Sequence, residues 1–217
     1  MTPVPAPGRR QACTTCLRPQ SACICRWITP VAHPVEVLVL QHPLEVDNPK
    51  GSARLLHLSL PRSRLVTGEV FDLPALLADA GGARHNLLLY PETPHNTPAA
   101  MLPRPLAPGA LDDPARLRLV VLDGTWRKSR KMLYANPLLQ QLPRLALQNV
   151  GVSHYLIRKA HRPDQLSTLE ATCAALAQLH GGAEPLQPLL AAFDGFVTQQ
   201  MRYQPLRGTG SPPTPDD

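Results

Sequence analysis

Residues 117–134 read LRLVVLDGTWRKSRKMLY, and the organisation of the chain follows from this stretch. The apolar run at its start, interrupted by a single arginine, is typical of a strand that is covered on both faces. Gly124 then permits a sharp turn, and Thr125 is a natural N-cap for a helix that continues to Tyr134. The sequence therefore predicts that Asp123 lies at the carboxyl end of a buried strand, beside a tryptophan and several cationic side chains.

Four other segments have the apolar, turn-bounded pattern of strands. They are residues 35–41, 64–70, 86–90 and 144–148. Helical spacing and capping residues predict further helices at 49–58, 73–79, 167–181 and 185–201, and we expect Asn136-Pro137 to stop the helix after Tyr134. This order of elements predicts a single α/β domain with a mostly parallel sheet flanked by helices.

Three of the predicted strands are followed at once by polar or aromatic residues, which are His42, Tyr90 and Asp123. Ligands of open α/β sheets bind at the carboxyl ends of the strands, so we interpret Asp123 as part of an active site. A structural interpretation stays open, because Asp-Gly after a strand is also an ordinary turn and Trp126 can be a core residue.

Length and charge limit the class of protein. The 217 residues suffice for one sizeable domain and a small appendage. The net charge of +6 and the isoelectric point near 9.4 favour a polyanionic partner. There is no run of about eighteen apolar residues and no signal sequence, so we expect a soluble cytoplasmic protein without a membrane partner.

Proline and glycine are concentrated in the first eight residues, in the segment 91–114 and in the last fourteen residues. The middle segment is expected to be a long loop, either a lid or a simple insertion. The expected organisation is a disordered tail at 1–10, a metal-binding knuckle at 11–30, the α/β domain at 31–203 and a second disordered tail at 204–217.

Four of the five cysteines lie within thirteen residues, at Cys13, Cys16, Cys23 and Cys25. Four soft ligands on two short loops fit a tetrahedral structural Zn²⁺ site in a reducing compartment. An iron–sulfur cluster or four unliganded thiols are the alternatives. Trp27, next to the cluster, either stacks on RNA or packs the knuckle onto the domain.

The segment Asp123-Gly124-Thr125-Trp126 resembles the signature of the DTW-domain family, the tRNA-uridine aminocarboxypropyltransferases. Three further stretches agree with the family in the same order: Gln41-His42-Pro43-Leu44-Glu45, Leu89-Tyr90-Pro91, and residues 155–159 followed by 166–171. With the cysteines, the resemblance spans roughly residues 13 to 180. It implies a fold similar to that of the SPOUT RNA-modifying enzymes, with a C-terminal knot.

This resemblance implies an enzyme that moves the 3-amino-3-carboxypropyl group of S-adenosylmethionine to N3 of a tRNA uridine, giving acp3U and methylthioadenosine. S-adenosylmethionine and tRNA are then the expected substrates. The glycine-rich G-x-G-x-x-G loop is absent, which argues against a Rossmann methyltransferase. The alternatives are a non-catalytic, zinc-dependent RNA-binding module and a SPOUT-type RNA methyltransferase.

The matching motifs imply three groups of functional residues. The catalytic group has Asp123 as general base or orienter, together with Thr125 and Trp126. The cofactor-binding group is His42, Pro43, Glu45, Tyr90, Pro91, Asp123, Gly124, Ser167, Thr168 and Glu170, and the RNA-binding group is Arg127, Lys128, Arg130, Lys131, Arg158 and Lys159. Ser167 and Glu170 also have the spacing of a capping box, at a helix N-terminus that can hold a ligand carboxylate.

Overall fold

A computed structural model of the protein describes residues 11–78, 84–92, 103–148 and 166–202. Its sheet has five strands in the order β2-β1-β4-β3-β5, and every neighbouring pair is parallel. The strands are β1 (Glu36–Gln41), β2 (Ser63–Thr67), β3 (His85–Leu89), β4 (Leu117–Asp123) and β5 (Arg144–Leu145). The predicted α/β class is confirmed, with a sheet that is parallel throughout.

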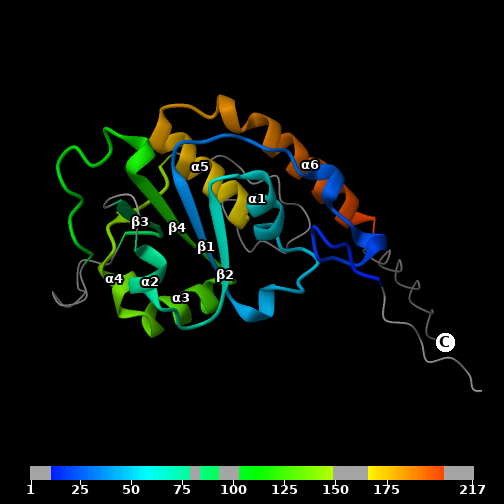
Figure 1. The fold of residues 1–217 in the computed structure, drawn as a ribbon, viewed down its shortest axis with the longest axis horizontal. Coiled ribbons are helices and arrows are strands. Elements are labelled where there is room, and N and C mark those ends of the chain that lie inside the picture. The colour runs from blue at the N-terminus through cyan, green and yellow to red at the C-terminus, as the bar shows by residue number, and fades with distance from the viewer. Residues whose placement is uncertain (1–10, 79–83, 93–102, 149–165, 203–217) are drawn as a thin grey trace, which may run out of the picture.

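Helices cover both faces of the sheet (Figure 1). One layer is α1 (Ala53–Ser59), α5 (Thr168–His180) and α6 (Gln187–Met201), and the other is α2 (Leu73–Leu77), α3 (Trp126–Ala135) and α4 (Pro137–Gln141). Successive strand residues point to opposite faces, so Val37 and Val39 pack in the first layer whereas Leu38 and Leu40 pack in the second. Burial on both faces explains why the central strands are almost continuously apolar.

After β1 the chain moves toward one side edge of the sheet, and after β4 it moves toward the opposite side edge. From β1 the chain passes through α1 to the neighbouring strand β2, whereas from β4 it passes through α3 and α4 to β5, on the far side of β3. Such a divergence between adjacent parallel strands opens a crevice at their carboxyl ends. Gln41 and Asp123 are register partners at this point.

The helix predicted at 49–58 begins later than expected, at Ala53. Residues 48–51 form a turn, in which the Gly51 amide donates to the Asn48 carbonyl (2.8 Å) and the Lys50 amide donates to Asn48 Oδ1 (3.0 Å). Asn48 therefore caps a turn and not a helix, a competition that is common for this residue type. The Arg18 guanidinium donates to carbonyls at both ends of this turn.

Helix α3 ends where predicted, but Pro137 starts α4 immediately, and this short helix was not expected. The buried Asn136 between them donates to the carbonyls of Met132 and Glu69, and it accepts a hydrogen bond from the Phe71 amide. It therefore ends α3 and also fixes the loop that follows β2.

Two predicted strands are too long, since pairing ends at Thr67 in β2 and at Leu145 in β5. The terminal tails, residues 93–102 of the 91–114 loop and the motif at 155–159 lie outside the described residues. The knot and the likeness to SPOUT enzymes stay predictions. Within the described segments, no helix combines the length and the apolar composition that crossing a membrane requires.

Candidate active site

Asp123 is the last residue of β4, and its side chain is held from two sides. Its Oδ2 accepts a hydrogen bond from Gln41 Nε2 (2.8 Å), and its Oδ1 accepts one from Thr168 Oγ1 (2.6 Å). Only 5% of the residue is exposed. Both oxygens therefore act as acceptors, which fixes the orientation of the carboxyl group. The fold thus brings Thr168 to Asp123 across 45 residues of sequence.

Thr168 is positioned by the capped N-terminus of α5. Ser167 Oγ accepts from the Glu170 amide (3.2 Å), and Glu170 Oε2 accepts from the Ser167 amide (2.8 Å), which confirms the predicted capping box. The Leu169 amide donates to Ser52 Oγ (3.2 Å). These backbone amides therefore donate to acceptors within the protein. Ser167 and Glu170 stabilise the N-terminus of α5, which carries Thr168.

His42 lies just beyond β1 and is almost completely buried. Its backbone amide donates to the Asp123 carbonyl (3.0 Å), and its Nδ1 accepts from the Leu44 amide (3.2 Å). The proton is thereby assigned to Nε2, which lies 2.8 Å from Glu69. Glu69 also contacts Lys131 (2.5 Å), and this hydrogen bond lowers the pKa of the Glu69 carboxyl.

Glu45 and Lys128, expected in different groups, form one ion pair. Lys128 Nζ donates to Glu45 Oε1 (2.7 Å), and Asn48 Nδ2 donates to Glu45 Oε2 (2.7 Å). The backbone explains the placement, since Pro43 opens a single 3-10 turn that carries Glu45 back toward α3. Gly124 allows the same approach from the other side, because a Cβ there would lie 3.0 Å from the Lys128 Cβ.

Trp126 is not a core residue. Its side chain is at the first position of α3 with 57% of the residue exposed, and its ring forms an edge contact with Tyr90 at a centroid distance of 5.8 Å. Arg144 lies 5.5 Å from the centre of the Tyr90 ring, and burial raises the pKa of the Tyr90 hydroxyl. Pro91 follows on the surface. The structural interpretation of Trp126 is therefore wrong.

A hollow of about 650 Å³ lies between His42 and the side chains of α3, and neither Asp123 nor Trp126 is among the residues that line it. Its walls carry cationic side chains of α3 together with apolar and acidic ones. The lining residues are His42, Leu44, Glu69, Thr125, Arg127, Lys128, Arg130, Lys131 and Tyr134. The hollow thus gathers the four cations of α3 that were predicted to bind RNA, whereas Arg158 and Lys159 lie outside the described residues.

Gln41 and Ser52 were given no functional role in the sequence analysis, although Gln41 begins one of the matching stretches quoted there. The signal for Gln41 was its place as the last residue of a predicted strand, because pairing β1 with β4 in parallel register puts it opposite Asp123. Ser52 offered no such signal, since its partner is an amide 117 residues away.

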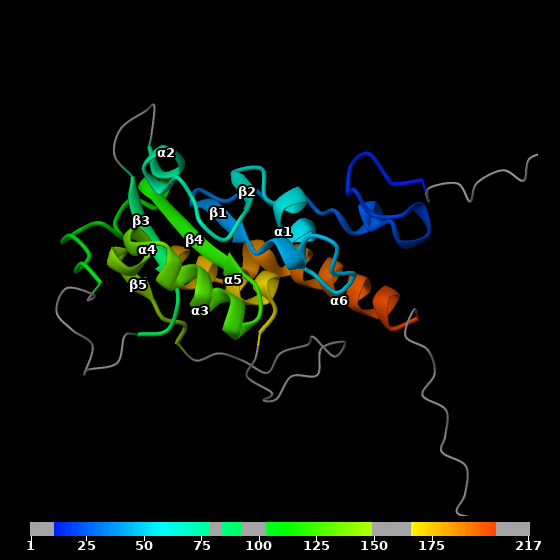
Figure 2. The ribbon, with the colours of Figure 1, turned by 90° about the horizontal axis from the view of Figure 1, so that it is seen from below.

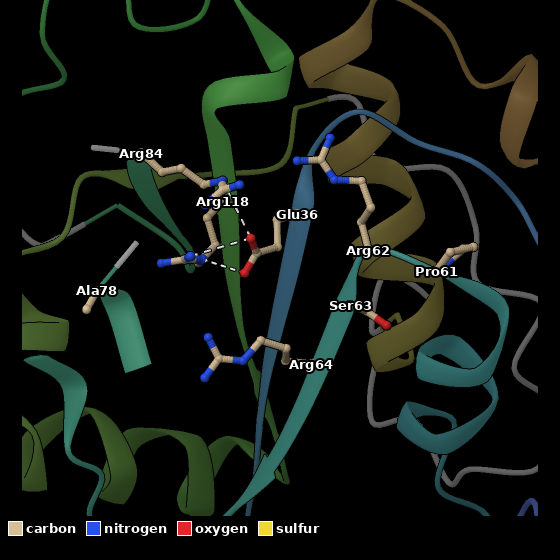
Figure 3. Close-up of a pocket in the computed structure, with 8 residues that line it drawn as sticks. All are labelled: Glu36, Pro61, Arg62, Ser63, Arg64, Ala78, Arg84 and Arg118. Atoms are coloured by element: carbon tan, nitrogen blue, oxygen red, sulfur yellow. Dashed lines mark hydrogen bonds and ion pairs between the residues drawn. The ribbon is translucent and has the colours of Figure 1, made fainter. Parts of the chain in front are cut away.

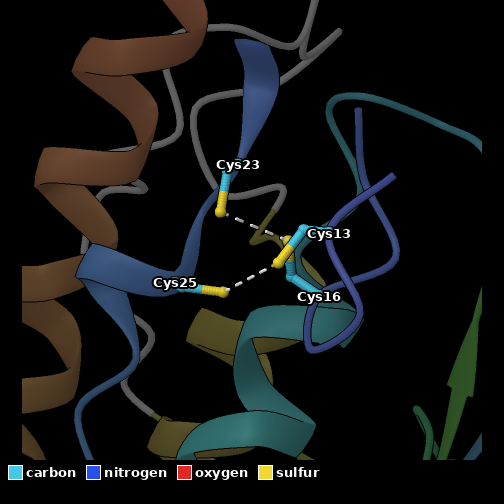
Figure 4. Close-up of side chains that lie close together, drawn as sticks. All are labelled: Cys13, Cys16, Cys23 and Cys25. Atoms are coloured by element: carbon cyan, nitrogen blue, oxygen red, sulfur yellow. Dashed lines mark hydrogen bonds between the residues drawn. The ribbon is translucent and has the colours of Figure 1, made fainter. Parts of the chain in front are cut away.

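The four cysteines form a compact cluster at the end of the molecule where α6 terminates (Figures 2 and 4). Cys13 and Cys25 Sγ are 3.5 Å apart, Cys16 and Cys23 Sγ are 3.7 Å apart, and all four sulfurs lie within 4.8 Å of one another. Backbone amides of the Cys13 loop lower the pKa of that thiol to about 6, while burial and the neighbouring sulfurs raise the pKa of Cys25 to about 12. Such a cluster can bind a metal ion.

Trp27 joins this knuckle to the α/β domain. Its Nε1 donates to Gln199 Oε1 (2.5 Å) in α6, and Gln199 Nε2 donates to the Cys23 carbonyl (3.0 Å). Its ring lies against Gly195, where a Cβ would be 2.2 Å from Trp27 Cζ3. Trp27 thus packs the knuckle onto the domain.

Known proteins resemble this chain over most of its length. The family model of the DTW domain matches residues 10–201. The chain is 31% identical to tRNA-uridine aminocarboxypropyltransferase 2 of Drosophila melanogaster, over 90% of this chain and 77% of that protein. It is 28% identical to tRNA-uridine aminocarboxypropyltransferase A of Arabidopsis thaliana, over 90% of this chain and 83% of that protein. No solved structure matches the chain.

Proposed function

Because the chain belongs to the DTW domain family, we propose that it transfers the 3-amino-3-carboxypropyl group of S-adenosylmethionine to N3 of a uridine in tRNA. The observation that carries this proposal is the DTW signature itself, with Asp123 held by Gln41 and Thr168 at the crevice between β1 and β4. The names of relatives that match most of the chain support the same activity.

The reaction forms a bond between uridine N3 and the methionyl carbon next to the sulfonium. The bond from that carbon to sulfur breaks, and its electron pair stays on sulfur, which becomes the neutral thioether of methylthioadenosine. The N3 proton must leave. Asp123 is our candidate for accepting that proton or for orienting N3 through it, since it presents a fixed carboxylate at the carboxyl edge of the sheet.

The neighbouring side chains suit the two substrates. We assign the donor to the region around His42, Pro43, Glu45, Tyr90, Pro91, Gly124 and Thr168, next to Asp123. The exposed ring of Trp126 offers a flat face for a nucleobase, in the way that aromatic side chains receive single-stranded bases. We assign the cations of α3 to tRNA phosphates, with the exposed Arg127 and Arg130 as the first contacts, because Lys128 and Lys131 already pair with glutamates.

We assign Zn²⁺ to the cysteine cluster, with Cys13, Cys16, Cys23 and Cys25 as ligands. Tetrahedral coordination at a Zn–S length of about 2.3 Å separates the sulfurs by about 3.8 Å. The sulfur pairs at 3.5 and 3.7 Å fit this value. When bound, the ion supplies structural cross-linking of the knuckle. Elemental analysis of the purified protein tests the assignment, with one zinc per chain expected and stoichiometric iron contradicting it.

The activity is tested by incubating the purified protein with unmodified tRNA and S-adenosylmethionine, then digesting the RNA to nucleosides for mass spectrometry. The expected result is acp3U together with an equal amount of methylthioadenosine. Methylated nucleoside with S-adenosylhomocysteine would replace this proposal with methyl transfer. Binding of tRNA without either product would leave a non-catalytic RNA-binding module.

A further inference from the structure

The amino-terminal edge of the sheet carries a second pocket, of about 330 Å³ (Figure 3). Four arginines and one glutamate line it: Arg62, Arg64, Arg84, Arg118 and Glu36. Arg118 and Asp123 are five residues apart along β4, which is about 17 Å at the rise of a strand. The pocket is therefore separate from the site described above.

Arg118 is a structural member of this pocket. It is 1% exposed, and its Nε and Nη2 donate to the two oxygens of Glu36, at 2.8 and 3.4 Å. Its Nη1 donates to the Leu77 carbonyl and to Asn86 Oδ1. Because Arg118 is occupied in this way, it neutralises Glu36 and is not oriented toward a ligand.

The other three arginines line the same pocket as this neutralised carboxylate. Arg84 Nε lies 3.5 Å from Glu36 Oε2, which orients its guanidinium. Arg62 and Arg64 are exposed, and each donates from one Nη atom to a backbone carbonyl, of Ala115 and Leu76 respectively. A backbone carbonyl orients a guanidinium group without cancelling its charge. The four arginines and one glutamate therefore give the described lining of the pocket a formal charge of +3.

We propose that this pocket binds backbone phosphates of tRNA, as a contact separate from the one on α3. Planar guanidinium groups held in fixed orientations bind phosphate oxygens through paired N–H bonds, which suits this ligand class. The inference rests on the proposed function, because that function supplies an RNA substrate.

The position of edge strand β2 favours RNA over a small phosphorylated molecule. Arg62 immediately precedes β2 and Arg64 is its second residue. Past the other end of β2, Glu69 pairs with Lys131, one of the cations of the α3 hollow. The five residues of β2 span roughly 13 Å. A folded RNA lying along this edge presents phosphates to both ends of the strand, whereas a small anion reaches only one.

The test uses the full-length protein and unmodified tRNA, with equilibrium binding measured across a series of salt concentrations. The pocket variant is R62Q/R64Q, and the control R104Q/R202Q removes the same charge at exposed arginines outside the pocket. We expect the pocket variant to bind tRNA about tenfold or more weakly at 0.1 M salt, with a salt slope smaller by about two. We expect the tRNA affinity of the control to change much less, and we expect both variants to unfold at the same temperature as the natural protein.

The proposal would be overturned if both variants lost the same amount of tRNA affinity, or if the pocket variant lost none. A titration with inorganic phosphate distinguishes the source of the anion, because phosphate binding that R62Q/R64Q abolishes without affecting tRNA would assign the pocket to a small phosphorylated molecule. The binding comparison does not depend on product formation. A chain that forms no acp3U would therefore refute the proposed activity while still deciding the role of the pocket.

Discussion

The Thr168 hydroxyl donates a 2.6 Å hydrogen bond to Oδ1 of Asp123, and this bond joins the first residue of α5 to the last residue of β4. The Gln41 amide fixes the other oxygen from β1. A carboxylate held through both oxygens cannot rotate without breaking one of these bonds. Its orientation toward a substrate is therefore set by residues from three separate elements.

Removing the hydroxyl at position 168 should impair turnover more than folding. We expect Thr168→Val to lower kcat/KM by roughly tenfold to a hundredfold, because the Asp123 carboxyl group loses a bond that fixes its orientation and a misplaced reacting group costs about that much. Thr168→Ser keeps the hydroxyl and is the matched control, with activity near that of the natural protein. The activity of both variants is measured as the steady-state release of methylthioadenosine. Equal activities of the Val and Ser variants would exclude a role for the hydroxyl.

Asp123→Asn keeps the shape of the side chain and removes its charge. We expect kcat to fall by about a hundredfold or more, the range of general acid–base contributions, while the unfolding midpoint stays within a few degrees. Single-turnover measurements with saturating tRNA and S-adenosylmethionine separate this effect from binding. Near-normal turnover would show that Asp123 neither accepts the N3 proton nor orients N3.

The cations of α3 should contribute unequally to RNA affinity. Arg127 and Arg130 are exposed, whereas Lys128 is paired with Glu45 across 2.7 Å. We expect Arg127→Gln and Arg130→Gln each to lower the salt slope of tRNA binding by about one, and Lys128→Gln to lower it less. Filter binding across salt concentrations tests this order. A larger effect of Lys128→Gln would reverse the assignment of first contacts.

Gly195 provides a test of how the knuckle is docked. In α6, alanine usually stabilises a helix by 0.5–1 kcal/mol relative to glycine, but the added Cβ would lie 2.2 Å from the Trp27 ring. Overpacking of this kind costs about 1–3 kcal/mol or more, so Gly195→Ala should destabilise the protein. At Gly182 a Cβ meets nothing within 4 Å, which makes Gly182→Ala the control. Denaturant unfolding of the metal-loaded protein compares the two variants.

His33 should make stability depend on pH. Burial, together with the nearby His180, lowers the pKa of His33 to about 4 from its ordinary 6.5. Between these two values the unfolded chain binds a proton that the folded chain does not, so stability falls as the pH drops from 6.5 to 4. The contribution is about 2–3 kcal/mol.

The variant His33→Asn isolates this effect. Its side-chain oxygen can accept the Val35 amide, as His33 Nδ1 does at 3.2 Å, but it does not titrate. We expect the thermal midpoint of the variant to fall less steeply between pH 6.5 and pH 4 than that of the natural protein. Parallel curves would mean that His33 is protonated to the same extent in both states.

Local signals predicted the elements whose ends are fixed locally. The capping pair Ser167 and Glu170 and the N-cap Thr125 all form as their spacing indicates. The start of α1 was mispredicted because Asn48 caps a turn at 48–51 and not a helix, and Arg18, distant in sequence, also stabilises this turn. A local pattern contains no information about such a contact.

The same limit applies to polar residues inside the sheet. Arg118 interrupts an apolar run, and nothing near it in sequence shows that Glu36 and Asn86 stand opposite it on the two neighbouring strands. Strand order and register decide both this buried pair and the contact between Gln41 and Asp123. Both contacts can therefore be recognised only once the order and register of the strands are known.

The bond between Trp27 and Gln199 spans 172 residues and has a consequence for synthesis. All four cysteines are synthesised before α6, so the knuckle can fold while its docking surface on α6 does not yet exist. The Trp27 side chain therefore lacks its partner Gln199 until α6 has been synthesised. During that interval the knuckle lacks its contact with α6, so truncation after α5 should leave a knuckle that is not docked on the α/β domain.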